Sequence, residues 1–244
     1  MFFNRIYLVD CGISRRNLTF KQIQQHATII PIMNYRFILP MLLAATTIVI
    51  TACSDSSTGA DVPESEIDVK TIENLSAVGD NGEFTFFSLR SGLVVPRSDS
   101  ASANWDLAFR GTTILVNSGV SGPGSAGAVV LDVPFQQVTI APSAGYNTDS
   151  AEVLAIPDGS GNGWYTYNPA QAMPPFAVLP RENVTIVLQT ADANHFAKVE
   201  IISYYYDNPD TSSEAFANLQ TRPESRYYTF RYALQRTEGL RDLN

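Results

Sequence analysis

The chain has very little cysteine and histidine, the two residue types on which most nucleophilic and metal sites depend. Among its 244 residues there are 2 cysteines and 2 histidines, and beyond residue 53 only His195 remains of either type. We therefore expect no internal disulfide in that part of the chain. A serine–histidine–aspartate triad is not expected either, because no Gly-x-Ser-x-Gly elbow accompanies the single histidine. A zinc site would have to be built mainly from carboxylates.

Basic residues are also scarce. Of the 16 lysines and arginines five precede Cys53, as does one of the 24 acidic residues, which leaves 11 basic and 23 acidic residues from Cys53 onwards. This balance argues against nucleic-acid binding, which needs clustered positive charge, and against electrostatic adhesion to anionic lipid. No spacing of carboxylates picks out the pair that a glycoside hydrolase needs. We expect a protein that is not an enzyme.

The longest apolar run ends at a cysteine. Residues 37–50 are mostly apolar, and Thr51, Ala52 and Cys53 follow them. The run is too short and too interrupted for a membrane-spanning helix, but it suits the apolar region of a signal peptide. Ile50-Thr51-Ala52-Cys53 has the form of a bacterial lipobox, in which small residues give the peptidase access and the thiolate takes up diacylglycerol. The pattern predicts a lipoprotein signal peptide at residues 33–52, with lipidation at Cys53.

The lipobox interpretation also predicts what lies before and after the signal peptide. Met33–Arg36 supplies a short positive start, so we expect residues 1–32 to be a mis-called leader; an unusually long n-region is the alternative. Two or three acyl chains on Cys53 are enough for stable membrane attachment. Ser54 favours the outer membrane or cell surface of a Gram-negative bacterium over inner-membrane retention.

The chain after the signal peptide has the sequence pattern of a single antiparallel all-β domain. We expect residues 53–74 to form a lipidated N-terminus and flexible tether, residues 75–238 the β domain, and residues 239–244 a C-terminal tail. Turn residues recur throughout, and no segment sustains a helical apolar period over three turns. A short helical turn is expected at Glu214–Leu219. The predicted strands are Glu83–Leu89, Trp105–Val116, Gly127–Val133, Gln136–Ala141, Glu152–Ile156, Trp164–Tyr167, Val184–Thr190, Phe196–Tyr206 and Tyr227–Gln235.

Two glycine-rich runs are interpreted as connecting loops. Residues 119–127 lack the Gly-Lys-Ser/Thr ending of a phosphate loop, and Pro123 removes a backbone donor. Residues 158–163 lack the terminal glutamate and the regular acidic ligands of a calcium hand.

Aromatic side chains gather on three of the predicted strands. Trp164, Tyr165 and Tyr167 share one strand, and the next loop carries Met173, the only methionine beyond residue 53. Further aromatics stand at residues 204–206 and 227–232. Such side chains most often pack in a core. Their density beside a methionine is also what a site for a flat apolar ligand would require, so both interpretations stay open.

The ordered set of short motifs resembles the HmuY family of haem-binding lipoproteins. The resemblance runs from Asn104-Trp105-Asp106-Leu107-Ala108-Phe109-Arg110-Gly111 and Asn117-Ser118-Gly119 through Gly163-Trp164-Tyr165-Thr166-Tyr167 to Tyr228-Thr229-Phe230-Arg231-Tyr232. It covers roughly residues 80–236. It implies an all-β fold and a surface lipoprotein that captures haem for delivery to a TonB-dependent outer-membrane receptor.

The resemblance also suggests site residues. Members hold the iron with two axial side chains, His in some and Met in others, from loops near residues 164–179. By position Met173 is the best axial candidate, while Asn168, directly after Tyr167, marks the departure from the two-histidine form. Tyr165 and Tyr167 are candidates for stacking on the porphyrin, and His195 is a weaker candidate ligand because it aligns with a turn. The alternative is a structural or protein-interaction lipoprotein of the same fold that has lost haem ligation.

Overall fold

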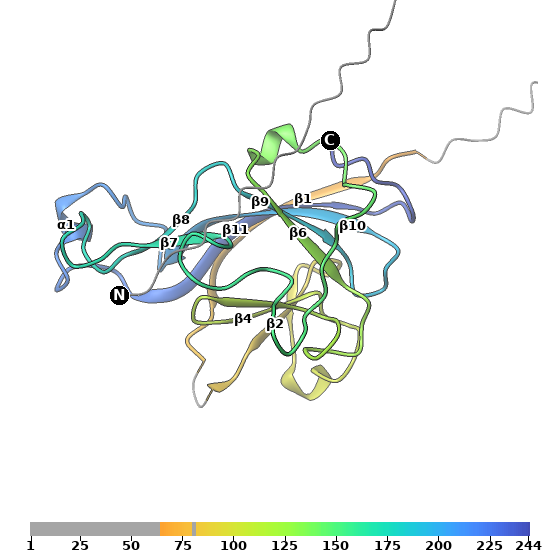
Figure 1. Cartoon of the computed structure of the whole chain (residues 1–244), viewed down its shortest axis with the longest axis horizontal. Coiled ribbons are helices and arrows are strands. Elements are labelled where there is room, and N and C mark those ends of the chain that lie inside the picture. The colour runs from red at the N-terminus through yellow and green to blue at the C-terminus, as the bar shows by residue number, and fades with distance from the viewer. Residues whose placement is uncertain (1–63, 80–81) are drawn as a thin grey trace, which may run out of the picture. The chain divides into compact units, whose positions relative to one another are not determined.

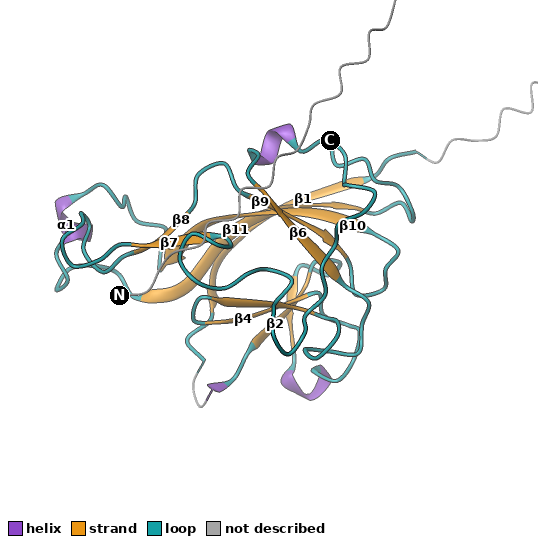
Figure 2. Ribbon diagram, in the orientation of Figure 1, coloured by secondary structure: helices purple, strands orange, loops and turns teal. Residues whose placement is uncertain are grey.

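In the computed structural model, which describes residues 64–79 and 82–244, antiparallel strands supply most of the regular structure (Figures 1 and 2). All of these residues belong to one unit. The larger sheet has five strands in the order β1-β11-β10-β9-β6. Their bounds are Ile67–Ser76 (β1), Ser225–Gln235 (β11), Phe196–Tyr205 (β10), Thr185–Gln189 (β9) and Gly127–Leu131 (β6).

Two smaller sheets complete the fold. One has the strand order β3-β2-β4-β5 and the other consists of β7 and β8. Their bounds are Leu93–Val95 (β3), Thr85–Ser88 (β2), Leu107–Arg110 (β4), Thr113–Val116 (β5), Tyr165–Tyr167 (β7) and Val178–Pro180 (β8). Helical structure in the described part is short and includes α1 (Glu214–Ala217) and 3-10 turns at Arg97–Asp99 and Phe135–Gln137. The all-β prediction and the helical turn after Ser213 are confirmed.

The main core lies between the five-stranded and the four-stranded sheet. Phe87 on β2 meets Phe230 on β11 with ring centroids 5.4 Å apart, and Phe109 on β4 meets Tyr228 at 5.0 Å. All four rings are essentially inaccessible to solvent. Edge-on and tilted contacts of this kind add to the free energy gained by burying the rings. Aromatic packing across the two layers therefore helps to hold the two sheets together.

The structure corrects both ends of the expected domain. Strand β1 begins at Ile67, within the stretch expected to be a flexible tether, and pairs with β11 along its length. The side chains that face inwards from its first half are polar: Asp68 binds Arg236 at 2.7 Å and Lys70 at 3.0 Å. Because ion pairs replace apolar residues there, the alternation of Ile67-Asp68-Val69-Lys70 is reversed: the polar side chains face inwards, and Val69 is 63% exposed.

The C-terminal residues are also part of the fold. Leu243 is 1% exposed, and its backbone N–H donates to Thr139 at 2.8 Å. The tail expected at residues 239–244 therefore packs against the outer face of the five-stranded sheet, the face turned away from the four-stranded sheet. There Leu243 joins a small cluster with Val138, Ala141 and Val187.

Several strand predictions differ from the structure in detail. Residues 105–116 form two strands, β4 and β5, because Arg110 and Thr113 close a hairpin around Gly111 at φ +54°. Residues 136–141 form a 3-10 turn and one isolated bridge from Ile140 to Asp242. Residues 152–156 form no strand. Strands β1, β3 and β8 were not predicted.

Both glycine-rich runs are loops, as predicted. Residues 119–126 connect β5 to β6 around the side chain of Asn117, which donates to the carbonyls of Ser102 (2.9 Å) and Trp105 (2.8 Å). A Cβ on Gly122 would lie 2.2 Å from the Asn117 side-chain oxygen, so only glycine allows the loop to close this tightly. The second run leads into β7.

Candidate functional site

The loop that carries Met173 is held by hydrogen bonds at its base. It joins β7 to β8, which pair from Tyr165–Pro180 to Tyr167–Val178. The Asn168 side chain donates to the carbonyl of Pro174 at 3.0 Å, and its backbone N–H donates to that of Ala177 at 2.8 Å. Asn168 thus serves as a brace inside the loop, and its side-chain nitrogen is engaged with the backbone.

The hairpin is also attached to the rest of the domain. The N–H of Val178 donates to the hydroxyl of Tyr205 at 3.0 Å, and the N–H of Tyr167 donates to the hydroxyl of Ser160 at 2.8 Å. The Tyr205 ring is buried at the end of β10. These contacts connect both strands of the hairpin to the domain.

Three large apolar side chains of this hairpin face solvent. Met173 is 75% exposed, Phe176 is 48% exposed and Tyr167 is 47% exposed. Phe176 also has a φ of +54°, a conformation that is uncommon for a bulky aromatic residue. Such strain tends to persist where it positions a side chain for a function. Phe176 is not among the site residues predicted from the sequence; its signal there is its place after two prolines in the methionine loop.

Most of the aromatic residues on the predicted strands are part of the core, which favours the first of the two interpretations that the sequence left open. Tyr165 is 8% exposed, and Trp164, Tyr204 and Tyr228 are more deeply buried. The Trp164 ring lies 4.9 Å from Tyr165, 5.7 Å from Tyr204 and 5.1 Å from Tyr228 between centroids. These rings pack against each other, so they present no face to a planar ligand. Of the two proposed stacking tyrosines, only Tyr167 is accessible.

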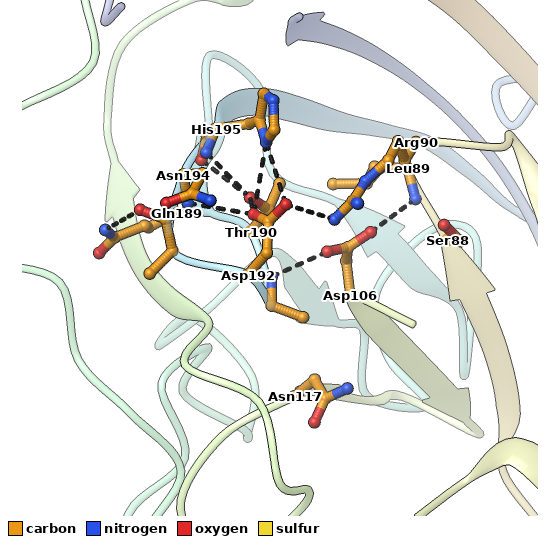
Figure 3. A network of polar contacts seen from close by, with 12 residues as sticks. Ser88, Leu89, Arg90, Asp106, Asn117, Gln189, Thr190, Asp192, Asn194 and His195 are labelled. Carbon is orange, nitrogen blue, oxygen red and sulfur yellow. Dashed lines mark hydrogen bonds and ion pairs between the residues drawn. The ribbon is translucent and has the colours of Figure 1, made fainter. Parts of the chain in front are cut away.

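His195 belongs to a separate polar network in the β9–β10 turn (Figure 3). Its Nδ1 lies 3.2 Å from an Asp192 carboxylate oxygen, and that carboxylate also forms an ion pair with Arg90. Burial opposes ionisation of Asp192, but hydrogen bonds from Thr190, Asn194 and His195 hold its pKa below the ordinary value. His195 is thus placed in a turn, as expected, and its ring supports the Asp192 carboxylate.

The structure does not bring His195 and Met173 together. His195 directly precedes β10, whereas the methionine hairpin is attached at Tyr205, the last residue of that strand. A strand of 10 residues spans about 33 Å. The two side chains therefore cannot serve as the axial pair of one porphyrin within a single copy of the chain.

Below this turn lies a buried carboxylate, Asp106. It is 4% exposed and accepts hydrogen bonds from the backbone N–H of Leu89 at 2.8 Å and of Ala191 at 2.9 Å (Figure 3). Burial raises the pKa of its carboxyl group, although both N–H groups act in the opposite direction. Asp106 joins the end of β2 to the β9–β10 turn, and hence one sheet to the other.

A hollow in the surface lies beside the methionine hairpin. Its volume is about 650 Å³, and its wall includes Leu179, Arg181, Ile202 and Arg231. Both arginines already have anionic partners: Arg181 pairs with Asp132 and Arg231 with Glu200. The hollow therefore offers mixed apolar and paired polar surface next to β8.

Some expected features lie outside the described residues, among them the apolar run and Cys53. Within residues 64–79 and 82–244, no helix is both long and apolar enough to cross a membrane. The same residues contain no cluster of three or more His, Cys, Asp or Glu side chains suited to a metal ion.

Comparison with known proteins gives one family. A family model described as HmuY protein matches residues 80–217, more than half of the chain. Among solved structures, the apo form of a Tannerella forsythia HmuY analogue (TFO) is 16% identical with a TM-score of 0.44. That match covers 72% of this chain and 98% of the other. Its structural similarity is weak, so the assignment rests on the family model. No curated protein matches.

Proposed function

Because the chain belongs to the HmuY family, we propose that it is a haem-binding surface lipoprotein that captures haem for uptake through a TonB-dependent outer-membrane receptor. The observation that carries the proposal is the methionine hairpin. Its loop holds an exposed thioether, with Phe176 and Tyr167 on the same hairpin also exposed. A thioether is a known axial ligand of haem iron, and aromatic faces suit a porphyrin. The residues present fit one axial ligand, Met173.

Each part of the hairpin has a role in this proposal. Met173 supplies the ligand atom, while Phe176 and Tyr167 supply apolar surface that excludes water from the porphyrin. Asn168 keeps the loop closed through its bonds to Pro174 and Ala177. Exposed apolar side chains of this size gain free energy when a ligand covers them, at about 25 cal/mol per Å².

The proposal predicts a saturable haemin titration that depends on Met173. Full-length protein in detergent should give a shifted Soret band with a Kd of about 1 µM or below, and Met173→Ala should weaken binding about tenfold. Phe176→Ala should weaken binding without changing the ligation signature of the spectrum. Val153→Ala removes an exposed apolar side chain (63%) from another loop and serves as the matched control.

Two results would count against this assignment. A native titration without saturation would reject haem binding and favour the alternative, a structural or protein-interaction lipoprotein of the same fold. The observation that favours this alternative is the burial of the other aromatic residues in the core. Loss of the Soret shift in His195→Ala, with Met173→Ala unchanged, would move the ligand to the β9–β10 turn.

Membrane attachment through Cys53 is a separate part of the proposal. Cys53→Ser should remove palmitate labelling and move the protein from the membrane fraction to the soluble fraction, because serine cannot form the thioether. Cys11→Ser is the matched control and should leave both labelling and fractionation unchanged. A Cys53→Ser protein that still carries palmitate would overturn the lipobox interpretation.

A further inference from the structure

A second, smaller hollow opens on the outer face of the five-stranded sheet. Its volume is about 370 Å³ and its wall consists of Glu73, Asn74, Asp207, Asn208 and Thr229. Glu73 and Asn74 lie at a bulge in β1, Thr229 lies on β11, and the other two residues follow β10. Three segments that are distant in sequence thus place oxygen-bearing side chains around one space.

Thr229 is the unusual member of this group. Its neighbours Tyr228 and Phe230 point into the main core, so by the alternation of a strand Thr229 points to the outer face, towards the hollow that it lines. Thr229 is 4% exposed, and its hydroxyl finds no hydrogen-bond partner among the described residues. A buried hydroxyl without a partner costs free energy, and such groups generally have an explanation such as a bound water or ion.

The two carboxylates at the hollow, those of Glu73 and Asp207, take part in no ion pair of the described residues. Asp207 is held in place by a reciprocal pair of bonds with Asn74: its Oδ1 accepts from the Asn74 side-chain amide at 2.8 Å, and its N–H donates to the Asn74 amide oxygen at 2.8 Å. The second carboxylate oxygen of Asp207 has no partner in that pair.

We propose that this hollow binds a hard divalent cation of the calcium class. Carboxylates of Glu73 and Asp207, the amide oxygen of Asn208 and the hydroxyl of Thr229 form the all-oxygen ligand set that calcium prefers, and water completes its 6–8 ligands. Magnesium is disfavoured because it demands a compact octahedron and sheds water reluctantly. With only two carboxylates, the affinity belongs to the weak range of calcium sites, with a Kd of about 10⁻⁴–10⁻³ M.

Calorimetric titration of the detergent-solubilised full-length protein, treated first with a chelator, tests the proposal. Calcium should bind with single-site saturation in that range, and magnesium at least about tenfold more weakly. Glu73→Gln and Asp207→Asn should each weaken calcium binding about tenfold or more. Both substitutions keep the size of the side chain, and the amide oxygen introduced by Asp207→Asn can still accept the bond from Asn74. Glu182→Gln, which removes an exposed carboxylate outside the hollow, is the matched control and should bind calcium as the native protein does.

Thr229→Val gives an independent test, because valine matches threonine in shape but lacks the hydroxyl. Calcium binding should weaken several-fold, while thermal stability without calcium should stay the same or rise, since the hydroxyl has no partner to lose. Absence of a saturable calcium response in the native protein would overturn the proposal. So would a native-like response when Glu73→Gln and Asp207→Asn are combined. Neither result bears on haem binding, which involves the methionine hairpin between β7 and β8.

Discussion

Asp106→Ala is expected to lower the free energy of unfolding by about 2–4 kcal/mol, measured by chemical denaturation. The substitution leaves two buried backbone donors, the N–H groups of Leu89 and Ala191, without their acceptor. Each orphaned donor costs about 1–3 kcal/mol. Removal of a carboxylate whose burial is itself unfavourable offsets part of this loss. We therefore expect an effect in the lower half of the combined cost of the two orphaned donors.

The conservative variant Asp106→Asn separates the acceptor role from the charge. One amide oxygen can still accept from Leu89 or Ala191, but the amide nitrogen then faces the other N–H group, so we expect a loss of about 1–3 kcal/mol. The variant also changes the pH dependence. Because burial raises the native pKa of Asp106, the folded state keeps a proton that the unfolded chain loses above about pH 3.9.

The sign of that pH effect follows from proton binding. Between the unfolded pKa and the raised native pKa the folded state holds more protons, so this group's contribution to stability falls as the pH rises through that interval. Asp106→Asn should remove this decline. Asp132→Ala is the control: its side chain is 76% exposed and its surface ion pair with Arg181 contributes about 0–1 kcal/mol. Equal effects of Asp106→Ala and Asp132→Ala would show that the buried carboxylate does not hold the two sheets together.

The sequence predicted best those elements whose apolar residues alternate. Val184, Ile186 and Leu188 are all buried, as are Ala197, Val199 and Ile201 on the partner strand. The turn at residues 191–194 is also confirmed, with Ala193 at φ +61°. In these strands one face is uniformly apolar and the other carries most of the polar residues, with exceptions such as Val187 and Ile202, so the direction of each side chain follows from the period.

Strand β1 escaped prediction because long-range ion pairs take the place of apolar residues. Asp68 meets Arg236, which lies 168 residues further along the chain, and nothing near Asp68 in the sequence indicates that contact. Strands β3 and β8 are too short, at 3 residues each, to show an alternation. Pairing partners of such segments depend on the tertiary fold rather than on local preference.

The candidate site was predicted in part. The position of Met173 on an exposed loop agrees with what a ligand would need, but that loop's apolar surface comes from Phe176 and Tyr167 rather than from the three strands rich in aromatics. A count of aromatic residues could not distinguish rings that face solvent from rings that face the core, because both faces of a strand can carry rings. The direction of each ring depends on whether a second sheet covers it, as β2 and β4 cover β11.

Tyr228→Ala is expected to cost about 3–5 kcal/mol of unfolding free energy, the range for an aromatic residue removed from a packed core. The ring is fully buried against Phe109, Trp164 and Tyr204. Its hydroxyl donates to the carbonyl of Gly111 at 2.8 Å, and burial raises its pKa well above the ordinary value, so it remains a donor at neutral pH. Tyr228→Phe should therefore cost only about 1 kcal/mol, the loss of that one bond.

Tyr167→Ala gives the matched contrast, because this tyrosine lies at the surface and is 47% exposed. Its effect on stability should stay within about 0.5 kcal/mol, yet it should weaken the haemin titration. Tyr228→Phe should do the reverse and lower stability while haemin binding stays unchanged. If Tyr228→Phe altered the Soret band of a folded protein and Tyr167→Ala did not, the porphyrin would have to enter between the two sheets, and the core aromatics would be its site.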